Sequence, residues 1–513
     1  MGEKSRTEYS AINTSAAMIC RVLTILAGYL TRVVFTRMLS ESYVGINGLF
    51  LDIINVLSFT ELGVGTAITF ALYKPVAEKD QEKQKSLMRL YQNIYRTVAL
   101  IVLLAGLFVI PFMDVLIKNK PEVNHLTLIY LMYLANTALS YLFIYKRSLV
   151  DAHQKLYIGV LYQSGFLLLQ YALQILVLVL TRNFLLYLTI YLLCTFGGNM
   201  AIARKADQLY PYLREKNVQP LPQQERQEIT RNIRAMLMHK LGGTVVNNTD
   251  NLLLSSMVGI GSVACYSNYF LVIGSVRQVL NQMFQGITAS VGNLGVIEDS
   301  KRLHRIFGAS FFMGQWLYGF AAIALYELLG PFVELSFGGQ YVFSRDITFI
   351  LCVNFYVTGL RQATLVFRDS LGLFWYDRYK SVAEAAINLV SSIILARRFG
   401  TVGVFVGTLI STMTTSAWVE PLVLYRVRLK SSPWPYYGKY LVYSLVIFAT
   451  AGLTHQVCAL VQGSAWRILL LRLPICLAVP NLVLLVCYHR TWEFRLLLHK
   501  ALGLLRQKTR RKA

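Results

Sequence analysis

The chain has 513 residues, of which 55% are hydrophobic and only 15% are charged. That composition excludes an ordinary soluble domain and is typical of a protein that crosses a membrane many times. The formal net charge of +24 would suit a nucleic-acid partner, but the basic residues gather in alternate loops between apolar runs, which is the pattern of membrane topology. We therefore expect membrane lipid, and no nucleic acid, as a partner.

Apolar runs recur from one end of the chain to the other, and about 20 residues suffice for one helical crossing of a bilayer. They predict an all-α polytopic membrane protein with about fourteen transmembrane helices. In chain order the predicted spans are 14–37, 44–72, 92–117, 124–145, 157–180, 183–203, 237–258, 264–290, 307–330, 347–367, 380–397, 402–425, 437–461 and 467–488.

The longest connection, after the sixth span, is basic, contains Pro211, Pro220 and Pro222 and has few apolar residues. It predicts a cytoplasmic linker between two six-helix lobes, with one ordinary long loop as the alternative. Each half opens with a helix, a turn containing Gly and Tyr, and a second helix with polar side chains, as in transporters built from repeats. The predicted parts are an N-terminal lobe at 1–203, a linker at 204–236, a C-terminal lobe at 237–425, two accessory helices at 426–490 and a basic tail at 491–513.

Lysine and arginine set the predicted orientation. They concentrate in the loops after the second, fourth, sixth, eighth, tenth and twelfth spans, whereas the opposite loops carry few. By the positive-inside rule both termini are expected on the cytoplasmic side. All seven cysteines lie in or beside apolar runs without a CxxC spacing, so we expect them to serve packing and predict no metal site.

The first two spans carry charged side chains, each of which costs at least ~2.5–3.5 kcal/mol at the centre of a bilayer. Arg21 and Arg32 fall on one face of the first span, and the second span contains Asp52 and Glu61. The second half repeats the pattern in its seventh, eighth, tenth and eleventh spans, with Asn248, Asp250, Arg277, Asn281, Arg361 and Glu384.

Any one of these side chains can be explained by a structural ion pair or an interhelical hydrogen bond, but as a set they favour a shared hydrated cavity. Guanidinium groups bind phosphate bidentately and keep their charge when buried, and amides suit sugar hydroxyls. The predicted substrate-binding residues are Arg21, Arg32, Asn248, Asp250, Arg277, Asn281 and Arg361. Asp52, Glu61 and Glu384 are expected to bind a coupling ion (H⁺ or Na⁺) or to form structural ion pairs; no catalytic residue or resident cofactor is predicted.

Three stretches resemble one family. They are RVVFTRMLSESYVGINGLFLDIINVLSFTELGVGTAITFALYKPVAEKD (32–80), TDNLLLSSMVGIGSVACYSNYFLV (249–272) and ITASVGNL (287–294). Together with the number of spans they resemble the bacterial polysaccharide flippases of the multidrug/oligosaccharidyl-lipid/polysaccharide (MOP) exporter superfamily. The resemblance implies two six-helix lobes with a pseudo-two-fold relation around a cavity that opens alternately to each side, with two further C-terminal helices. It also implies cavity arginines that contact the phosphate of an undecaprenyl-phosphate- or undecaprenyl-pyrophosphate-linked oligosaccharide.

We therefore expect a transporter, not an enzyme, that flips a lipid-linked oligosaccharide across the cytoplasmic membrane of a bacterium for cell-surface polysaccharide synthesis. Other polysaccharide-assembly proteins are expected as further partners. One alternative is a multidrug efflux antiporter of the same superfamily, whose pocket should be richer in acidic and aromatic groups and poorer in arginine. The other is a membrane glycosyltransferase or polymerase, which generally needs acidic residues on substantial outward loops, and the predicted outward loops are short.

Overall fold

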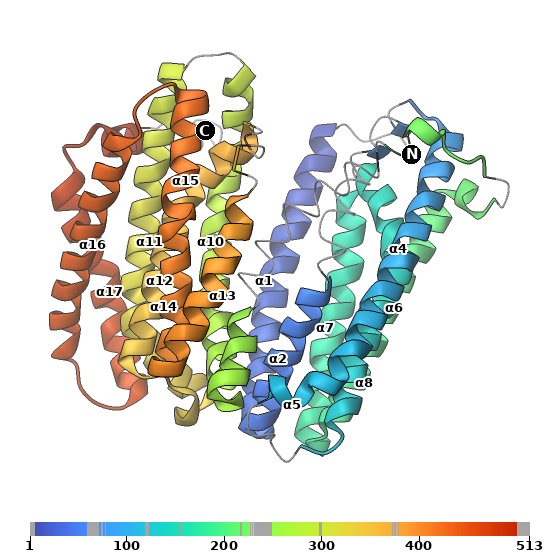
Figure 1. The fold of residues 1–513 in the computed structure, drawn as a ribbon, viewed down its shortest axis with the longest axis horizontal. Coiled ribbons are helices and arrows are strands. Elements are labelled where there is room, and N and C mark those ends of the chain that lie inside the picture. The colour runs from blue at the N-terminus through green and yellow to red at the C-terminus, as the bar shows by residue number, and fades with distance from the viewer. Residues whose placement is uncertain are drawn as a thin grey trace, which may run out of the picture. The chain divides into compact units, whose positions relative to one another are not determined.

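The computed structural model describes residues 6–499, apart from 59–70, 73–74, 77, 118–122, 154, 216–217, 226, 228, 230–248, 297–299, 372, 374–375 and 378. Within these residues the chain is nearly all helical and contains no strand, which confirms the predicted all-α class. Contacts between residues divide the chain into two compact units, Met1–Ala264 and Cys265–Ala513. Figure 1 shows both as bundles of long helices.

The first unit is built on long helices with clear end signals. Asp80 accepts a hydrogen bond from the backbone N–H of Lys83 at 2.9 Å, and Asn183 accepts one from Leu185 at 2.9 Å, so each caps the helix that follows it. Helix α1 packs against α7, and α6 packs between α4 and α8. The helices are α1 (Arg6–Met38), α2 (Glu41–Leu57), α4 (Gln81–Val109), α5 (Met113–Leu116), α6 (Leu126–Ala152), α7 (Leu156–Thr181) and α8 (Phe184–Leu209).

The second unit contains most of α10 and all the helices after it. Helix α11 packs against α12 and α17, and α13 packs against α14. The helices are α10 (Ile260–Val296), α11 (Ser300–Phe337), α12 (Arg345–Ser370), α13 (Lys380–Phe399), α14 (Thr401–Thr414), α15 (Ser416–Val423), α16 (Trp434–Ala459) and α17 (Ala465–Tyr488).

Nine helical segments in the described part of the chain are long and apolar enough to cross a membrane. They are Gln81–Leu116, Leu126–Ala152, Tyr157–Thr181, Phe184–Leu209, Arg302–Phe337, Arg345–Arg368, Thr401–Leu429, Trp434–Ala459 and Ala465–Tyr488. Their outer faces carry large apolar side chains, for example Phe108, Leu180 and Val486, which are 69%, 72% and 72% exposed. Such faces suit contact with lipid. The total of fourteen spans stays a prediction.

Two glycines bring α14 unusually close to α13. A Cβ atom on Gly403 would lie 2.2 Å from the backbone oxygen of Leu395, and one on Gly407 would lie 2.5 Å from the backbone nitrogen of Ser392. Only glycine fits at such a backbone approach. Gly400, with a φ of +56°, forms the turn between the two helices. This close packing places the polar residues of α13 directly against the hydroxyl groups of α14.

The accessory helices α16 and α17 are tied to α11 by polar contacts inside the second unit. Arg472 donates to Glu327 at 3.1 Å, and the Nδ1 atom of His455 lies 2.6 Å from the same carboxylate. Trp316 donates to Asn481 at 2.9 Å. These contacts attach both helices to the body of the second unit.

The described part of the predicted linker lies along α4. Helix α8 continues to Leu209, beyond the predicted end of its lobe at 203. The linker then makes contacts at Glu215, which accepts from Lys85 at 2.6 Å, and at Glu225, which accepts from Lys83 at 2.9 Å. Ser86 donates to the backbone oxygen of Gln219 at 2.6 Å. The first part of the linker is therefore fixed to the first unit. The predicted lobe boundaries stay a prediction.

Candidate functional site

A buried ion network joins α12, α13 and α15 in the second unit. Arg361 donates from Nη2 and Nε to the two carboxylate oxygens of Glu420, at 2.8 and 3.2 Å. Lys380 donates to the same carboxylate, and Arg368 lies 3.7 Å from it while also binding Asp377 at 2.9 Å. The side chain of Glu420 is 0% exposed. Three cations thus converge on a carboxylate that has no contact with solvent.

A second carboxylate, Glu384, extends the network along α13. It accepts from Nη1 of Arg361 at 3.3 Å, from the hydroxyl of Ser416 at 2.5 Å and from the hydroxyl of Thr412 at 3.3 Å. Arg361 and Thr412 donate to the same oxygen, Oε1, and Ser416 donates to the other, Oε2, so both carboxylate oxygens have a donor. These hydrogen bonds offset part of the cost of burying a carboxylate.

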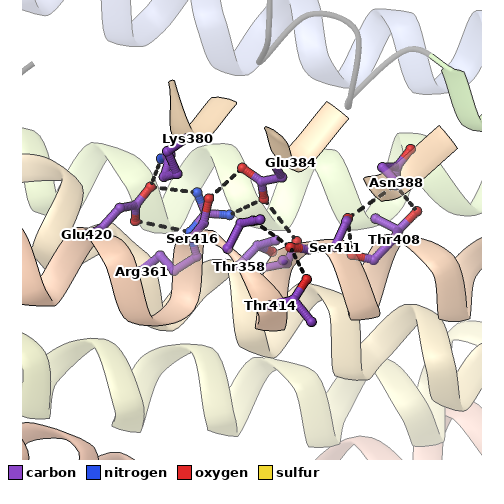
Figure 2. Close-up of polar contacts among 12 residues, drawn as sticks. Thr358, Arg361, Lys380, Glu384, Asn388, Thr408, Ser411, Thr414, Ser416 and Glu420 are labelled. Carbon is purple, nitrogen blue, oxygen red and sulfur yellow. Dashed lines mark hydrogen bonds and ion pairs between the residues drawn. The ribbon is translucent and has the colours of Figure 1, made fainter. Parts of the chain in front are cut away.

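Hydroxyl and amide groups continue the row beyond Glu384, as Figure 2 shows. Asn388, one turn further along α13, donates to Thr408 at 3.0 Å and to Ser411 at 3.4 Å. The row therefore runs along the seam between α13 and α14, where the helices approach most closely. Because its members bond to one another, it stabilises the packing of these helices.

The ion network balances its own charge. Three cations face three carboxylates: Arg361, Arg368 and Lys380 against Asp377, Glu384 and Glu420. A phosphate that bound Arg361 here would have to compete with two carboxylates. The geometry thus gives Arg361 and Glu384 an ion pair, and their predicted roles toward substrate and coupling ion stay predictions.

Arg277, on α10, is in a different situation. It is half-buried, its Cζ atom lies 6.0 Å from the centre of the Phe355 ring, and its Nε has no hydrogen-bond partner among the described residues. One turn later Asn281 accepts from the hydroxyl of Tyr318 at 2.5 Å. No described carboxylate forms an ion pair with Arg277. Among the described residues, therefore, no carboxylate offsets the charge of this guanidinium inside the helix bundle.

In the first unit, Asp52 on α2 meets the helical segment that starts at Thr249. Asn251 donates to Asp52 at 2.7 Å, and Asp250 is buried next to it. Ser255 donates to the backbone oxygen of Leu116 at 2.6 Å. This segment falls inside the sequence range predicted for the C-terminal lobe, yet it packs within the first unit.

Arg32 lies near the end of α1 and is half-buried, with its Cζ atom 5.6 Å from the centre of the Phe35 ring. The remaining predicted site residues cannot be placed as side chains. Arg21 belongs to α1, but its side chain lies outside the described part of the structure, and Glu61 and Asn248 lie outside the described residues altogether.

The sequence profile of a family described as "Polysaccharide biosynthesis protein" matches residues 10–288, which is more than half of the chain. The chain belongs to this polysaccharide biosynthesis protein family. No curated relative matches the chain in sequence.

Solved structures show that this polysaccharide biosynthesis protein has the fold of MOP-superfamily transporters. It is similar to the lipid II flippase MurJ in its inward closed conformation, with 13% identity, a TM-score of 0.66 and coverage of 92% of this chain and 98% of that one. It is also similar to an inward-facing multidrug resistance MATE family transporter of the MOP superfamily, with 13% identity, a TM-score of 0.61 and coverage of 81% and 98%. A MATE transporter from Vibrio cholerae, VcmN, matches with 15% identity, a TM-score of 0.53 and coverage of 83% and 99%.

The structure of this family member brings some predicted residues together and distributes the others. Arg361 and Glu384 form one network in the second unit, where Arg277 and Asn281 share a helix. Arg32, Asp52 and Asp250 belong to the first unit. A single cavity shared by all of them stays a prediction.

Sequence reasoning missed the centre of the ion network. Glu420 stands alone in the apolar run SAWVEPLVLY, and a lone carboxylate in such a run needs a cationic partner. That signal was present, but the partner Lys380 is 40 residues away and appears at a span edge in the sequence. Asp377 and Arg368 likewise appear as residues of a connecting loop and a helix end.

Proposed function

We propose that this protein flips a lipid-linked oligosaccharide, of the undecaprenyl-phosphate or undecaprenyl-pyrophosphate type, across the cytoplasmic membrane by alternating access. Membership of the polysaccharide biosynthesis family and the MOP-type transporter fold support a role in moving a polysaccharide precursor. In this proposal both termini lie in the cytoplasm, the driving ion is H⁺ or Na⁺, and proteins of polysaccharide assembly supply and consume the substrate.

The observation that carries the proposal is the contrast between two arginines. Arg361 is neutralised by carboxylates of its own unit, whereas Arg277 has no ion-pair partner among the described residues and a free Nε. An unmatched guanidinium among membrane helices is costly unless a ligand supplies the counter-charge. A phosphate group does so with bidentate geometry, and the neighbouring Asn281 amide suits a sugar hydroxyl.

Flipping of a fluorescent undecaprenyl-linked oligosaccharide in reconstituted vesicles tests this proposal. Arg277→Ala should slow flipping by roughly tenfold or more, which corresponds to about 1.4 kcal/mol or more of lost binding. Arg277→Lys should retain part of the rate because it keeps the charge but loses the fork geometry. Arg398→Ala, which removes an exposed arginine near the end of α13, is the matched control.

Equal flipping by wild type and Arg277→Ala would contradict the proposed phosphate contact. Wild-type protein that exports cationic drugs from cells but leaves the lipid-linked oligosaccharide in place would contradict the flippase proposal itself and favour the efflux alternative.

A further inference from the structure

Tyrosines from three helices gather around Arg32 inside the first unit. Tyr133 comes from α6, Tyr171 from α7, and Tyr187 and Tyr191 from α8, one turn apart on the same helix. Arg32 lies within electrostatic range of Tyr133 and Tyr187, and Tyr171 lies within range of both α8 tyrosines. The rings of Tyr133 and Tyr191 have their centres 6.1 Å apart. We call these five residues the tyrosine cluster.

Two asparagine amides complete the cluster. Asn47 accepts a hydrogen bond from the hydroxyl of Tyr133. Asn136 is only 5% exposed and bonds the hydroxyl of Tyr191, yet its Oδ1 has no hydrogen-bond partner among the residues that the structure describes. A buried acceptor without a donor destabilises the protein and is rare in native structures. It points to a donor-bearing ligand.

Local sequence explains how the cluster forms. Gly28 lies one turn before Arg32 on α1, and a Cβ atom there would lie 3.1 Å from the hydroxyl oxygen of Tyr171. The glycine therefore lets the Tyr171 ring sit against α1 beside the guanidinium. Arg32, Tyr187 and Tyr191 stay half-buried, so a ligand can reach them.

Elsewhere in the same unit, tyrosines pack differently. Tyr91 is 0% exposed, and Tyr95 and Tyr141, each 2% exposed, pack against one another with their ring centres 6.2 Å apart. Those three rings fill the α4–α6 core. In the tyrosine cluster Tyr133 is equally buried at 2% exposed, but the Tyr171, Tyr187 and Tyr191 rings are half-buried and lie next to a cation and an unsatisfied amide, a combination that core packing does not require.

We propose that the tyrosine cluster is a carbohydrate subsite, which binds sugar rings of the oligosaccharide; this inference rests on the proposed flippase function. Tyrosine rings offer flat apolar faces for the C–H face of a pyranose, and the Asn47 and Asn136 amides offer bonding groups for its hydroxyls. Arg32 binds an acidic group of the same ligand, either the phosphate that joins glycan to lipid or an acidic sugar.

Other ligand classes fit the tyrosine cluster less well. A purely apolar chain would offer no donor to the buried Asn136 oxygen and no polar contact to the Arg32 guanidinium. A cationic drug would be repelled by Arg32 at short range. A free phosphate would bind Arg32 but would make no use of the tyrosine ring faces. The glycan part of the substrate is the ligand that would contact all members of the cluster.

The position of the cluster gives it a place in the transport cycle. Arg32 lies about two turns from the end of α1 and Asn47 about two turns from the start of α2, next to the short turn that joins these helices. In the predicted topology this turn faces the outside of the cell. The subsite would then hold sugar rings in the outward half of the first unit.

Binding to the full-length protein in detergent tests this inference. The probes are undecaprenyl pyrophosphate and the same lipid carrying the oligosaccharide purified from the producing cells. We expect wild type to bind the glycan-bearing lipid about tenfold more tightly than undecaprenyl pyrophosphate. This ratio of affinities corresponds to about 1.4 kcal/mol. The double variant Tyr187→Leu/Tyr191→Leu, which keeps apolar volume, should reduce that ratio to about one and leave the affinity for the bare lipid unchanged. Tyr187→Phe/Tyr191→Phe should keep most of the ratio, and Tyr162→Leu, on the surface of α7, should keep all of it.

The outcomes separate this inference from the proposed function. If wild type binds neither lipid, the flippase proposal fails. If wild type binds both equally, or the leucine variant keeps the tenfold ratio, the carbohydrate subsite is overturned while the flippase proposal stands. Hydrogen exchange of wild type gives a second readout that needs no variant: the α8 peptide spanning 184–195 should be protected by the glycan-bearing lipid and not by the bare lipid, and equal protection by both would overturn the subsite.

Discussion

Neutralising Glu420 should unbalance the buried ion network of the second unit more than any other single change. In the wild type its carboxylate accepts from Arg361 at 2.8 and 3.2 Å and from Lys380, and Arg368 lies 3.7 Å away. Glu420→Gln leaves the side-chain volume nearly unchanged but removes the charge on which three cations converge. Two carboxylates then face three cations around a side chain that is 0% exposed.

The expected loss follows from that geometry. Removing one partner of a buried ion pair costs about 3–5 kcal/mol. For a unit of 249 residues (Cys265 to Ala513), each kcal/mol lowers the midpoint of thermal unfolding by roughly 2–4 °C, so Glu420→Gln should lower it by roughly 6–20 °C. Glu384→Gln should lower the unfolding midpoint by about half as much. Among the described residues only one cation, Arg361 at 3.3 Å, contacts Glu384, and two hydroxyl donors remain.

Tryptophan fluorescence in detergent is a suitable assay, because all six tryptophans of the chain follow residue 264 and therefore report on the second unit. Wild type and variants should be heated at one rate, since unfolding of such proteins is often irreversible. The double variant Lys380→Met/Glu420→Gln restores the charge balance and should unfold at a higher temperature than Glu420→Gln alone. A midpoint for Glu420→Gln within about 2 °C of wild type would refute the charge-balance argument. So would a double variant whose midpoint falls by the sum of the decreases caused by Lys380→Met and Glu420→Gln alone.

Three further changes test other parts of the structure. Gly407→Ala should destabilise the second unit by roughly 1–3 kcal/mol, because its methyl group would overlap the backbone of α13, whereas Gly438→Ala, which has open space around it, should be neutral in the same thermal assay. Glu215→Gln combined with Glu225→Gln should release the linker from α4 and raise its rate of cleavage by trypsin, and an unchanged cleavage rate would contradict the docked linker. Burial lowers the pKa of His153, so the unfolded state takes up a proton more readily and stability should fall as the pH drops below about 6.5; His153→Gln should flatten the dependence of the unfolding midpoint on pH between 7 and 5.

Local patterns in the sequence predict the helices well because apolar length and end signals are encoded within each segment. The span predicted at 183–203 is found as Phe184–Leu209 after the Asn183 cap. The residues predicted to span the membrane at 380–397 form the helix Lys380–Phe399 before Gly400. Helix ends extend beyond the apolar runs because polar residues at the membrane boundary continue the backbone hydrogen bonding of the helix.

The partners of the polar side chains were much harder to predict. Asp52 and Asn251 are hydrogen-bonded although 199 positions separate them, and the sequence does not indicate that Glu420 holds Arg361. A single sequence shows that a buried charge needs a counter-charge, but not which one, because that depends on how distant helices pack. The tyrosine cluster is not predictable from the sequence for a related reason. In an apolar helix an accessible tyrosine and a core tyrosine have the same local sequence pattern.

The balance of three cations and three carboxylates in the second unit also bears on how the family can diverge. A substitution that removes one charge leaves a net buried charge, and a later substitution of opposite sign removes it again. Lineages should therefore pass through paired replacements, and the alignment columns of Arg361, Lys380, Glu384 and Glu420 should covary instead of staying invariant. An alignment column whose side chain contacts the transported glycan, by contrast, should vary with the identity of the sugar. It should vary independently of the columns of these four residues.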